Sequence, residues 1–177
     1  MKDKLKLVSL VGIAIAVLSF GLLAIPGQFY DIMTNMKSSN PPHLMSGYQF
    51  IFNSLPDGFK SYSGVYGAGV SGLGVAALVI MAVAAICFGL YFVSSALPLF
   101  GGVASIVSGL FFLLMKPWGA DKLFKAYKSS SAILWSSYVI GALLFLVGVA
   151  AIYFSIKLLK EEKAHPKETV GYSYLKK

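Results

Sequence analysis

The sequence contains few residues that could perform chemistry, and their spacing forms no recognisable site. Among 177 residues there are seven acidic residues, two histidines and one cysteine. His43 follows Pro41-Pro42, and Asp31 and Asp57 lie in the same segment of the chain. Three such side chains are able to ligate a metal, but their separation matches no known ligand pattern. We therefore expect a solvated histidine, no metal and no catalytic group.

The single cysteine, Cys87, lies inside an apolar run and has no second cysteine with which to form a disulfide within the chain. Its expected role is that of a small apolar side chain packed among others. The sequence contains no nucleotide-binding loop and no other catalytic motif that we recognise. We expect neither enzymatic activity nor a bound cofactor.

The composition indicates a membrane protein. Hydrophobic residues make up 57% of the chain and charged residues 12%, against about 25% charged residues in an average globular protein. The net charge is +8, and every basic residue is a lysine. These lysines stand at the chain ends and in loops beside apolar stretches, which favours contact with lipid head groups over nucleic acid.

Four segments are apolar and long enough to cross about 30 Å of hydrocarbon, which takes roughly 20 helical residues. They cover about residues 5–25, 70–93, 97–115 and 132–156. The pair Pro26-Gly27 ends the first segment, and Pro98 opposes a continuous helix through the second and third. The predicted fold is therefore an all-α integral membrane bundle of four transmembrane helices.

This transmembrane domain is predicted to cover residues 1–160, followed by a polar cytoplasmic tail at residues 161–177. The fourth helix is expected to continue to about Ala164, where Pro166 stops it. A cleaved secretory signal is the alternative for the first segment, because basic residues precede its apolar run. That run is longer than the roughly 7–15 residues of a signal peptide, and no small-x-small cleavage site follows it.

The positions of the lysines predict the orientation. With both termini inside, nine lysines lie on the cytoplasmic side and six outside, and the reverse orientation inverts these numbers. We therefore predict a multi-pass protein of the cell membrane with cytoplasmic N- and C-termini. The loop at residues 116–131 is basic and is predicted to form a short interfacial helix, with Trp118 and Trp135 at the membrane surface.

The outer loop at residues 26–69 is rich in aromatic residues. They are Phe29, Tyr30, Tyr48, Phe50, Phe52, Phe59, Tyr62 and Tyr66. Rings near the ends of the loop fit an interfacial belt, whereas residues 48–52 predict a short strand before a turn at 55–58. The sequence leaves open whether this loop folds into a cap or lies on the lipid surface.

Small residues recur at spacings of four or seven within the predicted helices. The candidate helix-packing residues are Gly64, Ala68, Gly72, Ala76, Gly101, Ser105, Gly109, Gly141 and Gly148, with Ser137 preceding the last two. Residues four apart share a helix face, and small ones let two backbones approach closely. Glycine is also common in membrane helices in general. We expect tight helix contacts, within the chain or between subunits.

Four spans, a large first outer loop and a tight inner turn resemble the claudin-type tetraspan layout. The resemblance is one of topology, because this first loop lacks the tryptophan signature and the paired cysteines of that family. It assigns no role to any residue here, and it does not place the chain in that family.

No ionisable residue lies in the core of a predicted span, although proton relays and ion-coupled carriers generally need one. We therefore expect a non-enzymatic accessory or structural subunit of a larger membrane complex. Its partners would be lipid and other membrane subunits, or further copies of itself, and not nucleic acid. A small oligomeric channel or facilitator is the alternative. A quinone-site or enzyme subunit that uses the outer aromatic residues ranks third.

Overall fold

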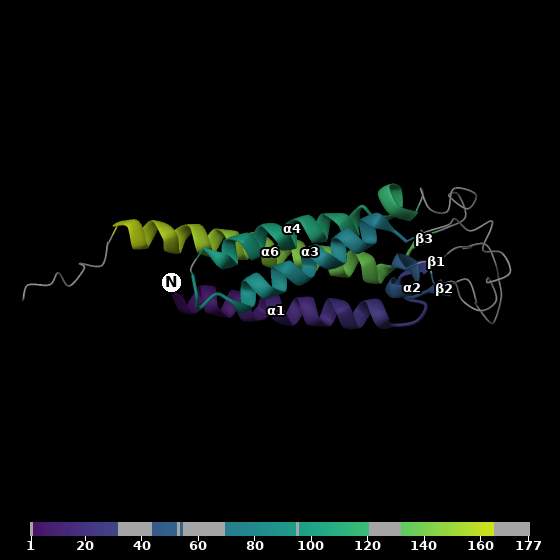
Figure 1. The fold of residues 1–177 in the computed structure, drawn as a ribbon, viewed down its shortest axis with the longest axis horizontal. Coiled ribbons are helices and arrows are strands. Elements are labelled where there is room, and N and C mark those ends of the chain that lie inside the picture. The colour runs from purple at the N-terminus through teal and green to yellow at the C-terminus, as the bar shows by residue number, and fades with distance from the viewer. Residues whose placement is uncertain are drawn as a thin grey trace, which may run out of the picture.

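Four long helices lie side by side in the computed structural model, and a small cap closes one end of them (Figure 1). The structure describes residues 2–31, 44–52, 54, 70–94, 96–120 and 132–164. The helices are α1 (Lys2–Ala24), α3 (Gly72–Gly89), α4 (Leu97–Leu113) and α6 (Trp135–Ala164). The start of α1 and the end of α6 lie at the same end of the bundle, opposite the cap.

Local residues explain where these helices begin and end. After α1 ends at Ala24, Gly27 adopts a φ of 67°, a left-handed conformation that glycine reaches without strain. The hydroxyl of Ser71 caps α3 by accepting a hydrogen bond from the Gly74 amide at 3.1 Å. Pro98 stands in the first turn of α4, where a backbone N–H has no helical partner in any case.

The predicted spans correspond to these four helices with shifts at their ends. The second helix stops at Gly89 rather than near residue 93, and the fourth begins at Trp135 and continues to Ala164 as predicted. α4 has 17 residues, which makes it about 26 Å long, shorter than the roughly 30 Å of a hydrocarbon core. A π-helical turn, η2 (Lys116–Ala120), follows it.

The helices pack chiefly in a ring, in which α1 contacts α3 and α6, and α4 contacts the same two helices. The buried residues of α1 alternate between spacings of four and three, and they are Leu5, Ser9, Gly12, Ala16, Ser19 and Leu23. The buried residues of α3 follow the same rule, and they are Gly74, Ala77, Met81, Ala84 and Phe88. A seam that repeats every seven residues is typical of bundles whose helices cross at shallow angles.

The cap is built from both segments that leave this end of the bundle. Strand β1 (Tyr30–Asp31) pairs antiparallel with β2 (Leu44–Met45) and with β3 (Ala132–Ile133), which gives the order β2-β1-β3. β1 and β2 belong to the predicted first outer loop, whereas β3 directly precedes α6. The described part of the first loop is therefore folded against the bundle.

The strand predicted at residues 48–52 is wrong, because this segment lies mainly in the short helix α2 (Gly47–Ile51). Its start is a capping box. The Ser46 hydroxyl accepts a hydrogen bond from the Gln49 amide at 3.2 Å, and the Gln49 side chain accepts one from the Ser46 amide at 2.9 Å. This local pairing outweighs the β preference of the aromatic residues. The turn predicted at 55–58 lies outside the described residues.

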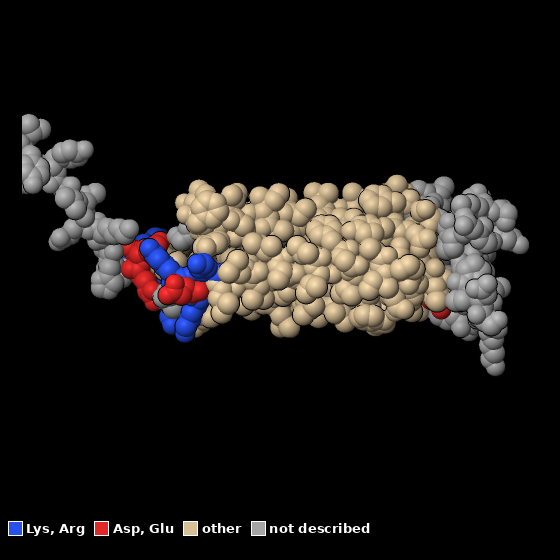
Figure 2. All heavy atoms as spheres, turned by 90° about the horizontal axis from the view of Figure 1, so that it is seen from below, with Lys and Arg blue, Asp and Glu red and all other residues tan. Residues whose placement is uncertain are grey.

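Three helices are long and apolar enough to cross a membrane, namely α1, α3 and the part Trp135–Lys163 of α6. α4 is apolar but shorter. In Figure 2 a band without charged residues separates the charged ends of α1 and α6 from the cap. These features support a membrane protein. A fourth crossing and the side to which the termini face stay predictions.

Candidate functional site

The predicted small residues meet most closely where α4 packs against α6. A methyl group added to Gly109 would lie 2.7 Å from the Gly141 carbonyl oxygen, and one added to Gly148 would lie 2.6 Å from the Gly102 carbonyl oxygen. Both distances are too short for any real side chain, so this approach of two backbones requires glycine. The two glycine pairs stand seven residues apart along each helix, as the seam of the bundle demands.

Gly102 was not among the predicted packing residues, and Gly101, which was, faces α3 instead of α6. The ring of Phe88 lies between α4 and α1. A methyl group on Gly101 would approach one edge of the ring to 3.0 Å, and one on Gly12 would approach the other edge to 2.5 Å. Phe88 is 1% exposed, so a single aromatic side chain fills the space shared by three helices.

The remaining predicted residues do not form one contact surface. Ser105 is buried in α4, and its hydroxyl has no hydrogen-bond partner among the described residues. Gly72 is exposed, with nothing in the described chain within 4 Å of an added methyl group, and Ala76 is half-buried. Gly64 and Ala68 lie outside the described residues. Gly72, in the four-residue repeat at the start of α3, therefore makes no close helix contact in the described chain.

Two buried serines connect neighbouring helices by hydrogen bonds. The Ser108 hydroxyl of α4 donates to the Ala77 carbonyl of α3 at 2.9 Å, and the Ser137 hydroxyl of α6 donates to the Phe112 carbonyl of α4 at 2.8 Å. Hydrogen bonds between helices of membrane proteins contribute about 0.6 kcal/mol on average. Ser137 belongs to the predicted pattern, whereas Ser108 was missed.

Sequence reasoning also missed the small residues of α1. Between Leu5 and Leu23 the buried face consists only of small side chains, namely Ser9, Gly12, Ala16 and Ser19. Their alternating spacing of three and four was the available signal. A pattern restricted to four-residue spacing does not include these residues, because their spacing repeats every seven.

Aromatic side chains fill the bundle where it meets the cap. The ring centroid of Phe50 lies 5.5 Å from that of Phe29 and 4.9 Å from that of Tyr30, and Phe29 lies 6.4 Å from Phe112 of α4. All four side chains are fully buried, and we call them the aromatic plug. The prediction that Phe29 and Tyr30 belong to an interfacial belt is therefore wrong, since they pack inward against their neighbours.

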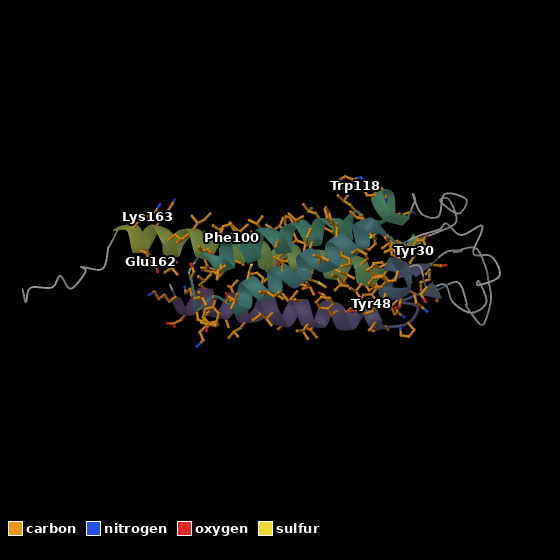
Figure 3. All side chains as sticks on the ribbon, viewed as in Figure 1. Tyr30, Tyr48, Phe100, Trp118, Glu162 and Lys163 are labelled. Atoms are coloured by element: carbon orange, nitrogen blue, oxygen red, sulfur yellow. The ribbon has the colours of Figure 1, made fainter. Side chains whose placement is uncertain are left out.

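Hydrogen bonds fasten the cap to the helices. The Trp135 indole N–H donates to the Gln28 side-chain oxygen at 2.7 Å, and the Ser136 hydroxyl donates to the Gln28 carbonyl. The Tyr48 hydroxyl donates to the Phe20 carbonyl of α1 at 3.2 Å. Tyr30 and Tyr48 both lie at the cap end of the bundle (Figure 3). Desolvation by burial raises the pKa of the Tyr48 phenol.

Residues with catalytic or metal-binding chemistry are not gathered in the described part of the chain. There, no group of three or more histidine, cysteine, aspartate and glutamate residues is placed to hold a metal ion. Asp31 lies in β1, and Cys87 is half-buried in α3. His43 and Asp57 lie outside the described residues, so the expected lack of a metal site stays a prediction.

The sequence was compared with known proteins. No protein-family model matches it, and no curated protein matches it either.

Proposed function

We propose that this chain is a multi-pass membrane protein without enzymatic activity, which serves as an accessory subunit of a larger membrane complex. The observation that carries the proposal is the aromatic plug. Its fully buried rings join the first outer loop to the bundle, and the small sheet adds the segment before α6. The described part of the cap is thereby held against the helices, which suits recognition of another subunit because these residues need not become ordered on binding.

The lateral surface of the bundle supports the same proposal. Large apolar side chains point outward on every long helix, with Val17, Phe100 and Leu146 more than 60% exposed; Figure 3 labels Phe100 on α4. The glycine pairs are already occupied by contacts within the chain. Contacts with other subunits would therefore use the larger exposed side chains, in competition with lipid.

The plug also bears on the alternative function of a channel. A passage along the axis of one chain would have to cross Phe29, Phe50 and Phe112, which pack against one another without exposed surface. A pore between copies would run along the described lateral surface, where apolar side chains predominate and an ion meets little polar lining. The plug would block the first route, and the second offers an ion little polar lining in the described chain, so we favour the accessory subunit.

Site-specific photocrosslinking in the native host tests this function. A photoreactive residue replaces Phe52, which is 51% exposed in the cap, and a second variant carries it at Val17, which is 63% exposed on the lateral surface of α1. We expect one protein adduct from position 52, and the same protein in constant ratio after purification in mild detergent. A fully stable monomer that yields no protein adduct from either position would contradict the proposal.

Membrane embedding is tested separately with lipids brominated at different depths. Trp118 and Trp135 are 53% and 52% exposed near the cap, where aromatic residues meet head groups. We expect their fluorescence to be quenched most by bromine close to the head group. Quenching that is absent, or equal at all depths, would contradict this placement.

A further inference from the structure

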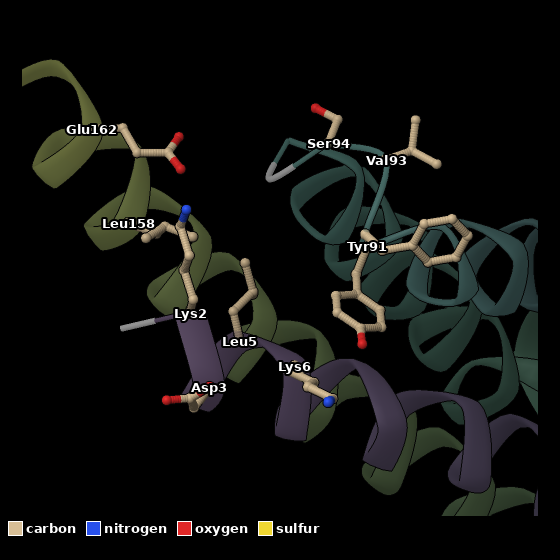
Figure 4. A pocket seen from close by; sticks show the side chains of 10 residues that line it. Lys2, Asp3, Leu5, Lys6, Tyr91, Val93, Ser94, Leu158 and Glu162 are labelled. Carbon is tan, nitrogen blue, oxygen red and sulfur yellow. The ribbon is translucent and has the colours of Figure 1, made fainter. Parts of the chain in front are cut away.

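A cavity of about 270 Å³ lies at the end of the bundle opposite the cap. Three separate elements surround it: the first turns of α1, the connection between α3 and α4, and the last turns of α6 (Figure 4). Its volume is slightly below the roughly 300–1,000 Å³ of pockets for drug-sized ligands. It is therefore suited to a small polar group rather than to a whole large ligand.

The floor of this cavity is apolar and its rim is charged. Leu5 and Leu158 contribute to the lining and are only 3% and 5% exposed. In Figure 4 the Lys2 side chain extends toward Glu162 on one side, while Lys6 and the hydroxyl end of Tyr91 point to the other side. Lys2 and Glu162 thus belong to one side of the hollow, and Lys6 and the Tyr91 hydroxyl belong to the other.

The cavity opens at the boundary between charged and uncharged surface. Directly beside it, Phe92 and Val93 line its wall and are 73% and 66% exposed. The uncharged band of the bundle begins on that side (Figure 2). In a bilayer this level corresponds to the head groups, with the acyl chains along the apolar band.

We propose that this cavity binds the head group of a zwitterionic phospholipid whose amine is a primary ammonium. The phosphate would lie near Lys6 and Tyr91, and the ammonium near the Glu162 carboxylate. The charges of the lining support a zwitterion over an anion, because Lys2 and Lys6 are balanced by Asp3 and Glu162. A primary ammonium donates hydrogen bonds to a carboxylate, whereas a trimethylammonium has no N–H to donate.

This inference depends on the membrane embedding that the proposed function also requires, and it is tested on the full chain without any partner. The purified protein is exchanged into detergent containing equal amounts of phosphatidylethanolamine, phosphatidylcholine and phosphatidylglycerol with identical acyl chains. Native mass spectrometry then counts the lipids retained. We expect one phosphatidylethanolamine to be retained about tenfold more than either competitor, which corresponds to about 1.4 kcal/mol.

Substitutions test which residues bind the lipid head group. Lys6→Gln and Glu162→Gln are expected to abolish the preference, whereas Lys163→Gln, an exposed residue of α6 outside the cavity, should leave it unchanged. Each variant is checked for its thermal unfolding temperature, so that loss of fold is distinguished from loss of lipid. Equal retention of the three lipids, a preference for phosphatidylglycerol, or an unchanged preference in Lys6→Gln would overturn the inference. Such results would leave the crosslinking test of the accessory function unaffected.

Discussion

Replacement of Gly109 by alanine tests whether backbone contact between α4 and α6 holds the bundle together. The added methyl group would lie 2.7 Å from the Gly141 carbonyl oxygen and 3.0 Å from the Phe145 amide nitrogen. Both are backbone atoms, which no change of rotamer can move. An ordinary contact begins near 3.4 Å, so the two helices would have to separate locally by about 0.7 Å.

The expected energy follows from this displacement. Overpacking of this kind costs about 1–3 kcal/mol, and the higher helix propensity of alanine offsets up to about 1 kcal/mol. We therefore expect Gly109→Ala to lower the free energy of unfolding by about 1–2 kcal/mol. The second glycine pair lies seven residues away, about 10 Å along the helix. In the Gly109→Ala variant the helices are already separated. A further Gly148→Ala should therefore lower the free energy of unfolding by less than Gly148→Ala does alone.

Gly21→Ala is the matched control for this substitution. It adds the same methyl group to a long apolar helix, at a position with nothing in the described chain within 4 Å. Unfolding is followed by tryptophan fluorescence while sodium dodecyl sulfate is titrated into mild detergent micelles. If Gly109→Ala and Gly21→Ala unfold at the same fraction of dodecyl sulfate, the tight glycine contact does not stabilise the protein and the reasoning fails.

Three further predictions use the same unfolding assay. Ser137→Ala should lower the free energy of unfolding by about 0.6 kcal/mol, because it removes a buried hydrogen bond between helices. Ser155→Ala should leave it unchanged, because that buried hydroxyl has no partner in the described structure; equal effects would refute this. Gly12→Ala should be destabilising alone but partly rescued by Phe88→Leu, since the ring edge occupies the space of the methyl group; strictly additive effects would count against the contact. Tyr48→Phe should cost about 0.5–1.5 kcal/mol below pH 10. Burial raises the pKa of Tyr48 in the folded protein. The Tyr48 hydroxyl therefore contributes its full stabilisation below the ordinary pKa of about 10, and this contribution falls as the pH rises above that value. The stability advantage of the wild type over Tyr48→Phe should shrink in alkali.

The cap shows why part of the fold was mispredicted. Aromatic residues at 48–52 favour a strand by their average preference, yet the hydrogen bonds of Ser46 with Gln49 start a helix there. That signal was readable in the sequence as Ser-x-x-Gln. The pairing of β1 with β3 was not readable, because it joins Tyr30 to Ile133 across more than one hundred residues.

The residues of the candidate site could also be predicted from the sequence only in part. Glycines at 109, 141 and 148 could be selected from the sequence because small residues permit close helix approach. The partner of Gly148 could not, since Gly101 and Gly102 are neighbours of the same type and only the rotation of α4 decides which one faces α6. The side of a nearly uniformly apolar helix that is buried is set by the shapes of its neighbours, because lipid and protein interior differ little in polarity.

Composition and local signals by themselves determined that this chain is mostly helical and apolar, where its long helices break, and where α6 ends at Ala164. These properties arise from residues close together in the chain, namely runs without charge, prolines, glycines and caps. Tertiary structure alone decided the pairing of Gly102 with Gly148, the inward aromatic plug and the charged cavity beside Leu5. Each of these requires helices to be brought together at a particular rotation and height, and no local preference specifies either.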